Sequence, residues 1–179
     1  MLGILLFPAT TVLFIIFSYN LVAFLVKKKP FPKRWAAALV VGITLTSAIM
    51  VYRLYFFSFS GLEGEHYKAP LPSPDGQYTA DAYYNTYGGA AGGVNVWVDV
   101  TDHNNGDHVK TIYLGNAKEQ FSLKWTDGET LYIQNETSGN NKYERSIELN
   151  VMTEIYHDTG LACQSLLLKE TYETCYEHE

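Results

Sequence analysis

The sequence predicts a membrane-anchored, mainly β fold: a two-helix transmembrane hairpin, then a small antiparallel β-sandwich or meander with one C-terminal helix. Three observations predict it. The first 60 residues hold two long apolar runs and no Asp or Glu. Apolar and polar side chains then alternate between turn-forming residues. A leucine-containing tail follows. The expected organisation is a hairpin over residues 1–59, a linker over 60–72 and a β-rich domain over 73–179.

Charge is divided unevenly along the 179-residue chain. The net charge is −6, and 47% of the residues are hydrophobic. All 19 Asp and Glu residues lie after residue 60, whereas every charged residue before it is Lys or Arg. Such different compositions mark two separate parts. The acidic second part argues against binding nucleic acid or polyanionic wall polymers, because like charges repel.

Two apolar segments are each long enough to cross the hydrocarbon core of a bilayer. The first, about residues 2–26, has no charged side chain, and the second, about 35–57, contains only Arg53 near its end. The loop between them, residues 27–34 (KKKPFPKR), is strongly basic, which indicates the cytoplasmic side. Both chain ends are therefore expected outside the plasma membrane.

Each apolar segment also has an alternative interpretation. A cleaved signal peptide is the alternative for the first. It would need basic residues before its apolar run and a small-x-small cleavage site after it, and the sequence has neither. A buried core helix is the alternative for the second.

Six strands are expected in the second part, because apolar side chains recur at every second position there. Their apolar rows span Tyr78–Tyr84, Val94–Val100, Val109–Leu114, Phe121–Trp125, Leu131–Ile133 and Tyr143–Val151. Asn-Gly in HNNGDH predicts a hairpin between the second and third strands, and Asp-Gly in WTDGET one between the fourth and fifth. The tail, with Thr159 as cap and leucines at 161 and 166–168, predicts one short helix over the sheet or its edge.

The stretch SPDG fits a type I turn, in which Pro presets φ and Gly closes the turn. Together with the later YGGA, KTIY and LKWTDGETLYIQ, it resembles an uncharacterised family of small membrane-anchored proteins of Gram-positive bacteria, a domain of unknown function. The matching positions are Ser73, Pro74, Asp75, Gly76, Tyr78, Gly88, Gly89, Trp125 and Leu131. Two spans and a Cys-bearing tail depart from the family pattern. The resemblance implies an exported β-domain and no activity.

Residues 88–93 hold four Gly and two Ala beside aromatic residues. A phosphate-binding P-loop would need a Lys-Ser or Lys-Thr pair leading into a helix, and a strand is expected here instead. One interpretation is a flexible hairpin loop. The other is a binding loop, in which mobile glycines lie beside rigid aromatic anchors. The binding residues expected in that case are Tyr83, Tyr84, Tyr87, Gly88, Gly89 and Trp97.

Cys163 and Cys175 are the only cysteines. Outside the membrane an even number favours a disulfide, with two free thiols as the alternative. DVTDHNNGDH lacks the Gly spacing and the final Glu of a calcium loop, and two His without a third ligand do not make a zinc site. We therefore expect no metal and no cofactor. Neither GxSxG nor HExxH occurs.

These features favour a non-enzymatic domain outside the membrane that binds a protein or peptide partner, as an accessory, sensor or immunity-type envelope protein. One alternative is an envelope hydrolase whose carboxylates converge in a cleft. Another is a small subunit of a membrane complex that acts through its spans, where Thr44, Thr46 and Ser47 are polar. A deep pocket with convergent titratable groups would favour the hydrolase, and an exposed aromatic patch the binding domain.

Overall fold

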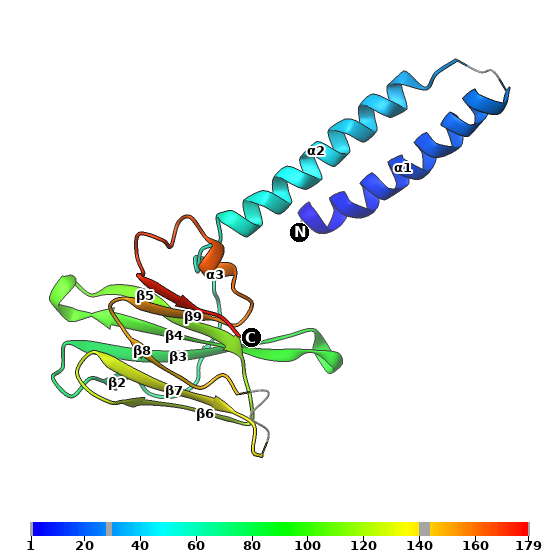
Figure 1. Ribbon diagram of the computed structural model, residues 1–179. Coiled ribbons are helices and arrows are strands. Elements are labelled where there is room, and N and C mark those ends of the chain that lie inside the picture. The colour runs from blue at the N-terminus through cyan, green and yellow to red at the C-terminus, as the bar shows by residue number, and fades with distance from the viewer. Residues whose placement is uncertain (1, 28–29, 140–143, 179) are drawn as a thin grey trace. The chain divides into compact units, whose positions relative to one another are not determined.

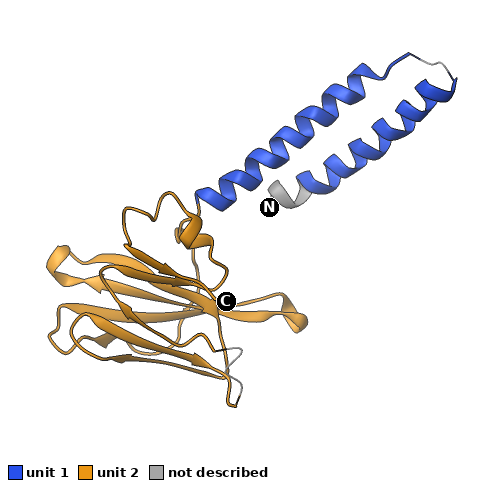
Figure 2. Cartoon of the chain, viewed as in Figure 1, with its two compact units in different colours: residues 1–56 blue, residues 57–179 orange. Residues whose placement is uncertain are grey.

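The computed structural model describes residues 2–27, 30–139 and 144–178. The chain divides into two compact units, residues 1–56 and 57–179 (Figure 2).

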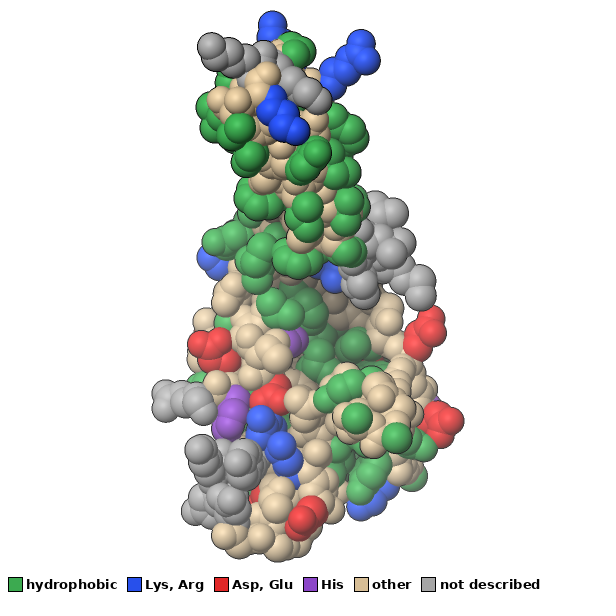
Figure 3. All heavy atoms as spheres, turned by 90° about the vertical axis from the view of Figure 1, so that its right-hand side faces the viewer, with side chains coloured by type: hydrophobic (Ala, Val, Ile, Leu, Met, Phe, Trp, Pro, Cys, Tyr) green, Lys and Arg blue, Asp and Glu red, His purple; other side chains and the backbone are tan. Residues whose placement is uncertain are grey.

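Unit 1 consists of two helices, α1 (Leu2–Lys27) and α2 (Lys33–Tyr55). Both are long and apolar enough to cross a membrane, α1 from Leu6 onward and α2 over its whole length. Figure 3 shows hydrophobic side chains over the visible face of this helical hairpin, with Lys and Arg side chains at the end where its helices are joined. The two predicted apolar helices are confirmed.

Small and hydroxylated residues lie where α1 and α2 meet. The hydroxyl oxygens of Thr10 and Thr46 are 3.1 Å apart across the interface. A Cβ atom added to Gly42 would lie 3.4 Å from the Thr10 hydroxyl oxygen, so the side chain of Thr10 packs directly against this glycine. Such residues allow two apolar helices to approach closely.

Unit 2 is a sandwich of two sheets (Figure 1). The seven-stranded sheet has the order β1-β3-β4-β5-β9-β10, and β2 also pairs with β3. Its strands are β1 (Glu65–His66), β2 (Leu71–Pro72), β3 (Tyr78–Tyr87), β4 (Gly93–Asp102), β5 (His108–Asn116), β9 (Glu154–His157) and β10 (Thr174–Tyr176). The three-stranded sheet has the order β6-β7-β8, formed by β6 (Gln120–Trp125), β7 (Thr130–Glu136) and β8 (Ile147–Asn150).

The two sheets share one hydrophobic core. Its most completely buried side chains include Val96, Val98, Val100, Ile112, Tyr113, Leu131, Ile133 and Leu149, each with at most 1% of its surface exposed. They come from both sheets, so burying them holds the layers together, and this burial is the main favourable term in folding.

The predicted strands and hairpins of the first five apolar rows are confirmed. β4 and β5 are joined through Gly106 and Asp107, which have positive φ angles of 64° and 58°. The sixth predicted row corresponds to β8, which begins at Ile147, while Tyr143 lies outside the described residues.

The SPDG turn forms as predicted, with the backbone N–H of Gly76 donating to the carbonyl of Ser73 at 3.0 Å. However, this turn does not follow a free linker. It joins β2 to β3 as a hairpin, and β1 also pairs with β3. The expected linker over 60–72 is therefore partly sheet, because the edge of β3 offers backbone groups with which this short segment pairs.

The predicted antiparallel sheet needs a correction, and the predicted short C-terminal helix is confirmed with a different cap and extent. The sheet is mixed, not purely antiparallel, because β9 runs parallel to both β5 and β10. The C-terminal helix α3 is only Leu161–Gln164, and its N-cap is Gly160, with φ 71°, in place of Thr159. Residues 166–168 leave the helix because Ser165 adopts an extended conformation and ends it.

Candidate functional site

The predicted binding residues lie on two different faces of the large sheet. Tyr83 and Trp97 are cross-strand partners on β3 and β4, and their rings stack with centroids 5.5 Å apart. Trp97 is nevertheless only 3% exposed. The backbone at Gly64 passes directly over it, since a Cβ atom there would lie 2.3 Å from the indole. Trp97 is thus a packing residue and not an accessible anchor.

Tyr84 and Tyr87 point to opposite faces because they are an odd number of residues apart on β3. The Tyr84 hydroxyl donates to the Glu65 carboxylate at 2.6 Å. Tyr87 is 47% exposed, and its ring lies across Gly93, where an added Cβ atom would be 2.7 Å from the hydroxyl oxygen. Its hydroxyl donates to the side-chain oxygen of Asn116 at 2.7 Å.

The glycine loop is an ordered turn. Gly88 and Gly89 have φ angles of 76° and 62°, which glycine adopts without strain. A short 3-10 helix, η1 (Gly89–Ala91), follows, and all of its residues are exposed. Because side chains with a Cβ atom rarely adopt such φ angles, the glycines are explained by this turn geometry.

A pocket of about 350 Å³ lies between the two sheets. Its lining residues are His66, Tyr67, Tyr84, Val94, Val96, Ala117, Lys118 and Phe121. We call it the intersheet pocket. Its size falls in the range of pockets that hold small ligands or single side chains, and its wall combines aromatic rings with polar groups.

A smaller pocket of about 110 Å³ adjoins the first. The two share Tyr67 and Phe121, whose rings meet edge to face with centroids 5.2 Å apart. Of this pair, Tyr67 is 39% exposed, whereas Phe121 is buried. Of these two rings, Tyr67 is therefore the one that an arriving molecule can reach.

The intersheet pocket has a basic side. Lys118 lines it, and burial, followed by the positive charge of Arg145, lowers the pKa of its ammonium group. No Asp or Glu is among the described residues that line it, although the Glu65 carboxylate accepts the hydrogen bond of the lining residue Tyr84 at 2.6 Å. An anionic group placed here would favour the charged form of Lys118. The pocket thus combines aromatic rings with a cation, within a domain that is acidic as a whole.

A pair of carboxylates, as a hydrolase would use, lies on the other face of the large sheet. Asp81 and Asp99 are cross-strand partners. Burial, and secondarily the charge of Asp81, raises the pKa of Asp99, although the Thr111 hydroxyl donates to it at 2.6 Å. Neither carboxylate lines the intersheet pocket. A substrate bound in this pocket would therefore not contact the two carboxylates.

A Thr-His-Asp line also occurs at the β4–β5 hairpin. The Thr79 hydroxyl oxygen lies 2.9 Å from Nε2 of His103, and Nδ1 of His103 lies 2.6 Å from the Asp107 carboxylate. The side chains of His103 and Asp107 are 42% and 74% exposed. Triad catalysis depends on a water-excluded site with oxyanion donors, so this exposed arrangement is best understood as a cap on the hairpin.

Comparison with known families identifies the family to which the chain belongs. Residues 33–156, more than half of it, match a family of unknown function, DUF5412. The chain belongs to DUF5412. No curated protein and no solved structure matches it. Membership of an uncharacterised family agrees with the resemblance carried by the SPDG turn, and the DUF5412 description gives no indication of an enzyme.

The DUF5412 match runs from Lys33, the first residue of α2, to Tyr156 in β9. It therefore covers the second apolar helix and every residue that lines the intersheet pocket. The pocket residues His66, Tyr67, Lys118 and Phe121 were not predicted from the sequence. They are far apart along the chain, and only the packing of the two sheets brings them together.

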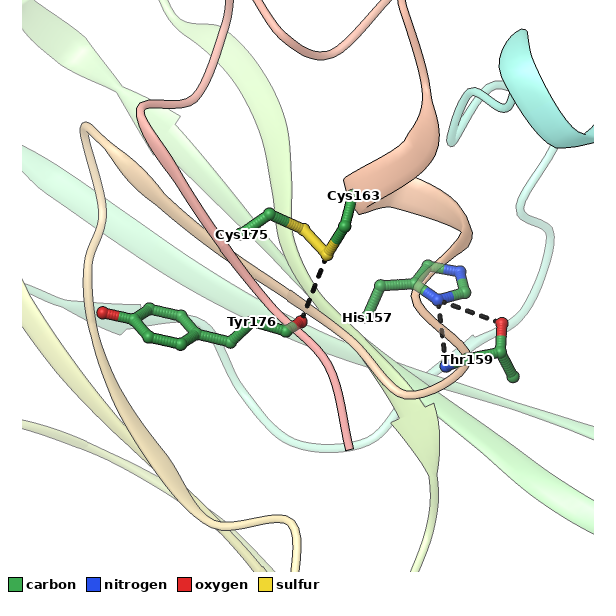
Figure 4. Close-up of a disulfide and its surroundings, with 5 residues drawn as sticks. All are labelled: His157, Thr159, Cys163, Cys175 and Tyr176. Atoms are coloured by element: carbon green, nitrogen blue, oxygen red, sulfur yellow. Dashed lines mark hydrogen bonds between the residues drawn. A yellow bond between two sulfur atoms is a disulfide. The ribbon is translucent and has the colours of Figure 1, made fainter. Parts of the chain in front are cut away.

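The region after the DUF5412 match contains the cysteines. Cys163 of α3 and Cys175 of β10 form a disulfide across 12 positions of sequence (Figure 4). Near it, the backbone N–H of Thr159 donates to Nδ1 of His157 at 3.2 Å, and burial lowers the pKa of that imidazole. The disulfide fastens α3 to the last strand of the large sheet.

Proposed function

We propose that this DUF5412 protein is a non-enzymatic binding domain held at the outer face of the plasma membrane by α1 and α2. Two apolar helices joined by a basic loop support this topology, because short basic loops stay in the cytoplasm. The β-sandwich would then lie outside the cell, where a disulfide is stable.

The intersheet pocket is the observation that carries the binding function. We propose that it takes an aromatic or aliphatic side chain of a protein or peptide partner, with a neighbouring carboxylate directed to Lys118. Tyr67 and Phe121 supply apolar surface, and Lys118 supplies the positive charge for the carboxylate. Buried aromatic anchors of this kind dominate the binding energy of many interfaces.

N-acetylphenylalanine is a suitable probe, since it joins one phenyl ring to one carboxylate. Full-length protein in lipid nanodiscs should transfer NMR saturation to its ring protons. Tyr67→Ser and Lys118→Gln should each weaken that transfer. Tyr87→Ser is the matched control, because Tyr87 is similarly exposed but lies outside the pocket. Equal transfer in all three variants would refute the proposed site.

The uncharged amide of the same probe tests the role of Lys118 separately. With the wild-type protein the amide should bind more weakly than the carboxylate. With Lys118→Gln the two probes should bind equally, because the charge they distinguish is gone. A carboxylate preference that persists in Lys118→Gln would mean that another cation receives the anion.

A second candidate function is that of a subunit that acts through its helices. The supporting observation is a notch of about 280 Å³ in unit 1, lined by apolar residues and by hydroxyls of Thr10, Thr11, Thr46 and Ser47. An apolar notch that also presents small hydroxylated residues, and that the two helices leave uncovered, suits a third membrane helix. Crosslinking from position 47 in membranes should then capture a membrane protein, and crosslinking to lipid alone would oppose this function.

A further inference from the structure

Two neighbouring leucines are exposed in the loop after α3. Leu166 and Leu167 are 50% and 52% exposed, and they are the only exposed leucines among the described residues of unit 2. Leu168, the next residue, packs against the hydrophobic core. An adjacent pair of large apolar side chains in water is unfavourable, so a partner that covers it would gain free energy.

The loop that carries the two leucines is fixed at both ends. Ser165 is fully buried, and its hydroxyl donates to the carbonyl of Phe57 at 2.6 Å. At the other end, the carbonyl of Leu168 accepts hydrogen bonds from the backbone N–H groups of Thr171 and Tyr172. The backbone of this loop is therefore held at both ends before any partner arrives, and ordering it costs little further entropy.

The hydrogen bond from Ser165 to Phe57 also places the loop close to Phe57. Phe57 is two residues beyond Tyr55, the last residue of α2. Consecutive Cα atoms are about 3.8 Å apart, so Phe57 lies at most about 8 Å from the end of this helix. The ring of Phe57 packs edge to face on His157, with centroids 4.9 Å apart, which fixes this point within unit 2.

The end of α2 marks a bilayer boundary if the helix spans the membrane. Its 23 residues extend roughly 34 Å, slightly more than a hydrocarbon core of about 30 Å. Phe57 would then lie in the headgroup region, which is roughly 5–8 Å deep on each side. Ser165 contacts Phe57 directly, and the two exposed leucines follow Ser165 without a break.

We infer that Leu166 and Leu167 insert into the interfacial region of the leaflet from which α2 emerges, an inference that rests on the membrane anchoring proposed above. The partner is the lipid bilayer itself. The exposed Lys169 follows the leucines and suits contact with lipid phosphates. The binding domain is then attached to the membrane at two points, the covalent one at residue 57 and this loop, which restricts its rotation.

Fluorescence in nanodiscs tests this insertion. Single cysteines at Leu167, Val109 and Ile43, labelled with the fluorophore NBD in the full chain with Cys163–Cys175 oxidised, report three environments. All three native side chains are at least half exposed. With doxyl-labelled phosphatidylcholine in the nanodisc, we expect blue-shifted, quenched emission at position 167 and at position 43 in α2. Position 109 in β5 should stay unquenched.

The outcomes distinguish insertion of the loop from the membrane anchor on which it rests. Quenching at position 43 without quenching at 167 would overturn the insertion while leaving the membrane anchor intact. The absence of quenching at position 43 would contradict the anchor itself. Equal quenching at 109 and 167 would also overturn the inference, because the fluorophore and not the loop would then be seeking the lipid.

Discussion

Arg145 and Asp158 form an ion pair, with Nε of the guanidinium 2.5 Å from a carboxylate oxygen. Their side chains are only 11% and 7% exposed. The other carboxylate oxygen accepts from the backbone and side-chain N–H groups of Asn116, at 3.2 Å each. The pair therefore fastens the segment before β8 to the ends of β5 and β9.

This ion pair makes stability depend on pH. Burial alone would raise the pKa of Asp158, but hydrogen bonds from Asn116 and the charge of Arg145 outweigh it, so the pKa lies below its ordinary value of 3.8. A depressed pKa contributes stability above pH 3.8 that is lost as pH falls through the folded value.

Asp158→Asn should remove this contribution and break the ion pair to the largely buried Arg145 side chain. We expect a loss of about 3–5 kcal/mol at pH 7. The difference in melting temperature between wild type and variant should narrow toward pH 3, as measured by circular dichroism of the full chain in detergent. Asp81→Asn is the control, because it replaces an Asp of β3 that takes no part in this ion pair. A difference that stays constant with pH would contradict this account of the pair.

Gly64 is predicted to be intolerant of a side chain. A Cβ atom would lie 2.3 Å from the Trp97 ring and 2.4 Å from the carbonyl oxygen of Tyr84. Gly64→Ala should therefore lower stability by about 1–3 kcal/mol, the usual cost of overpacking. The urea midpoint of the full chain measures it, with the neighbouring Glu63→Ala as control. If both variants unfold at the wild-type midpoint, the segment before β1 does not pack on the sheet.

The disulfide is predicted to stabilise the tail. Replacing Cys163 and Cys175 together by Ser releases a crosslink across 12 positions, which costs about 3 kcal/mol in the chain-entropy model. Denaturation of the double variant measures this loss, and it should match that of wild type treated with a reductant. Maleimide labelling of both cysteines in untreated protein would show that the bond does not form.

Alternation of apolar and polar residues was sufficient to predict a strand wherever that strand has one solvent-exposed face and a turn at each end. The row Tyr78–Tyr84 and the turns with Asn-Gly and Asp-Gly identify their strands for this reason. β9 has no such pattern, because three of its four residues are buried. Alternation therefore disappears, and the parallel pairing of β9 with β5 could not be expected from the residues.

Trp97 shows why the candidate site could not be predicted from the sequence alone. Alternation places it on the polar face with Asn95 and Asp99, which suggests exposure. The backbone at Gly64 covers it in the folded chain, so the aromatic anchor is lost. Tyr67 was not predicted as a binding residue, because it lies in the segment 60–72 that was expected to be a linker. Its contact with Phe121, far along the chain, depends on how the two sheets pack.

The orientation of the chain in the membrane is the most direct test of the account. Single cysteines at Phe31 and Lys68, in a chain with Cys163 and Cys175 replaced by Ser, can be labelled in cells with an impermeant maleimide. We predict labelling of position 68 in intact cells, and of position 31 only after permeabilisation. Labelling of position 31 and protection of position 68 in intact cells would contradict an extracytoplasmic binding domain.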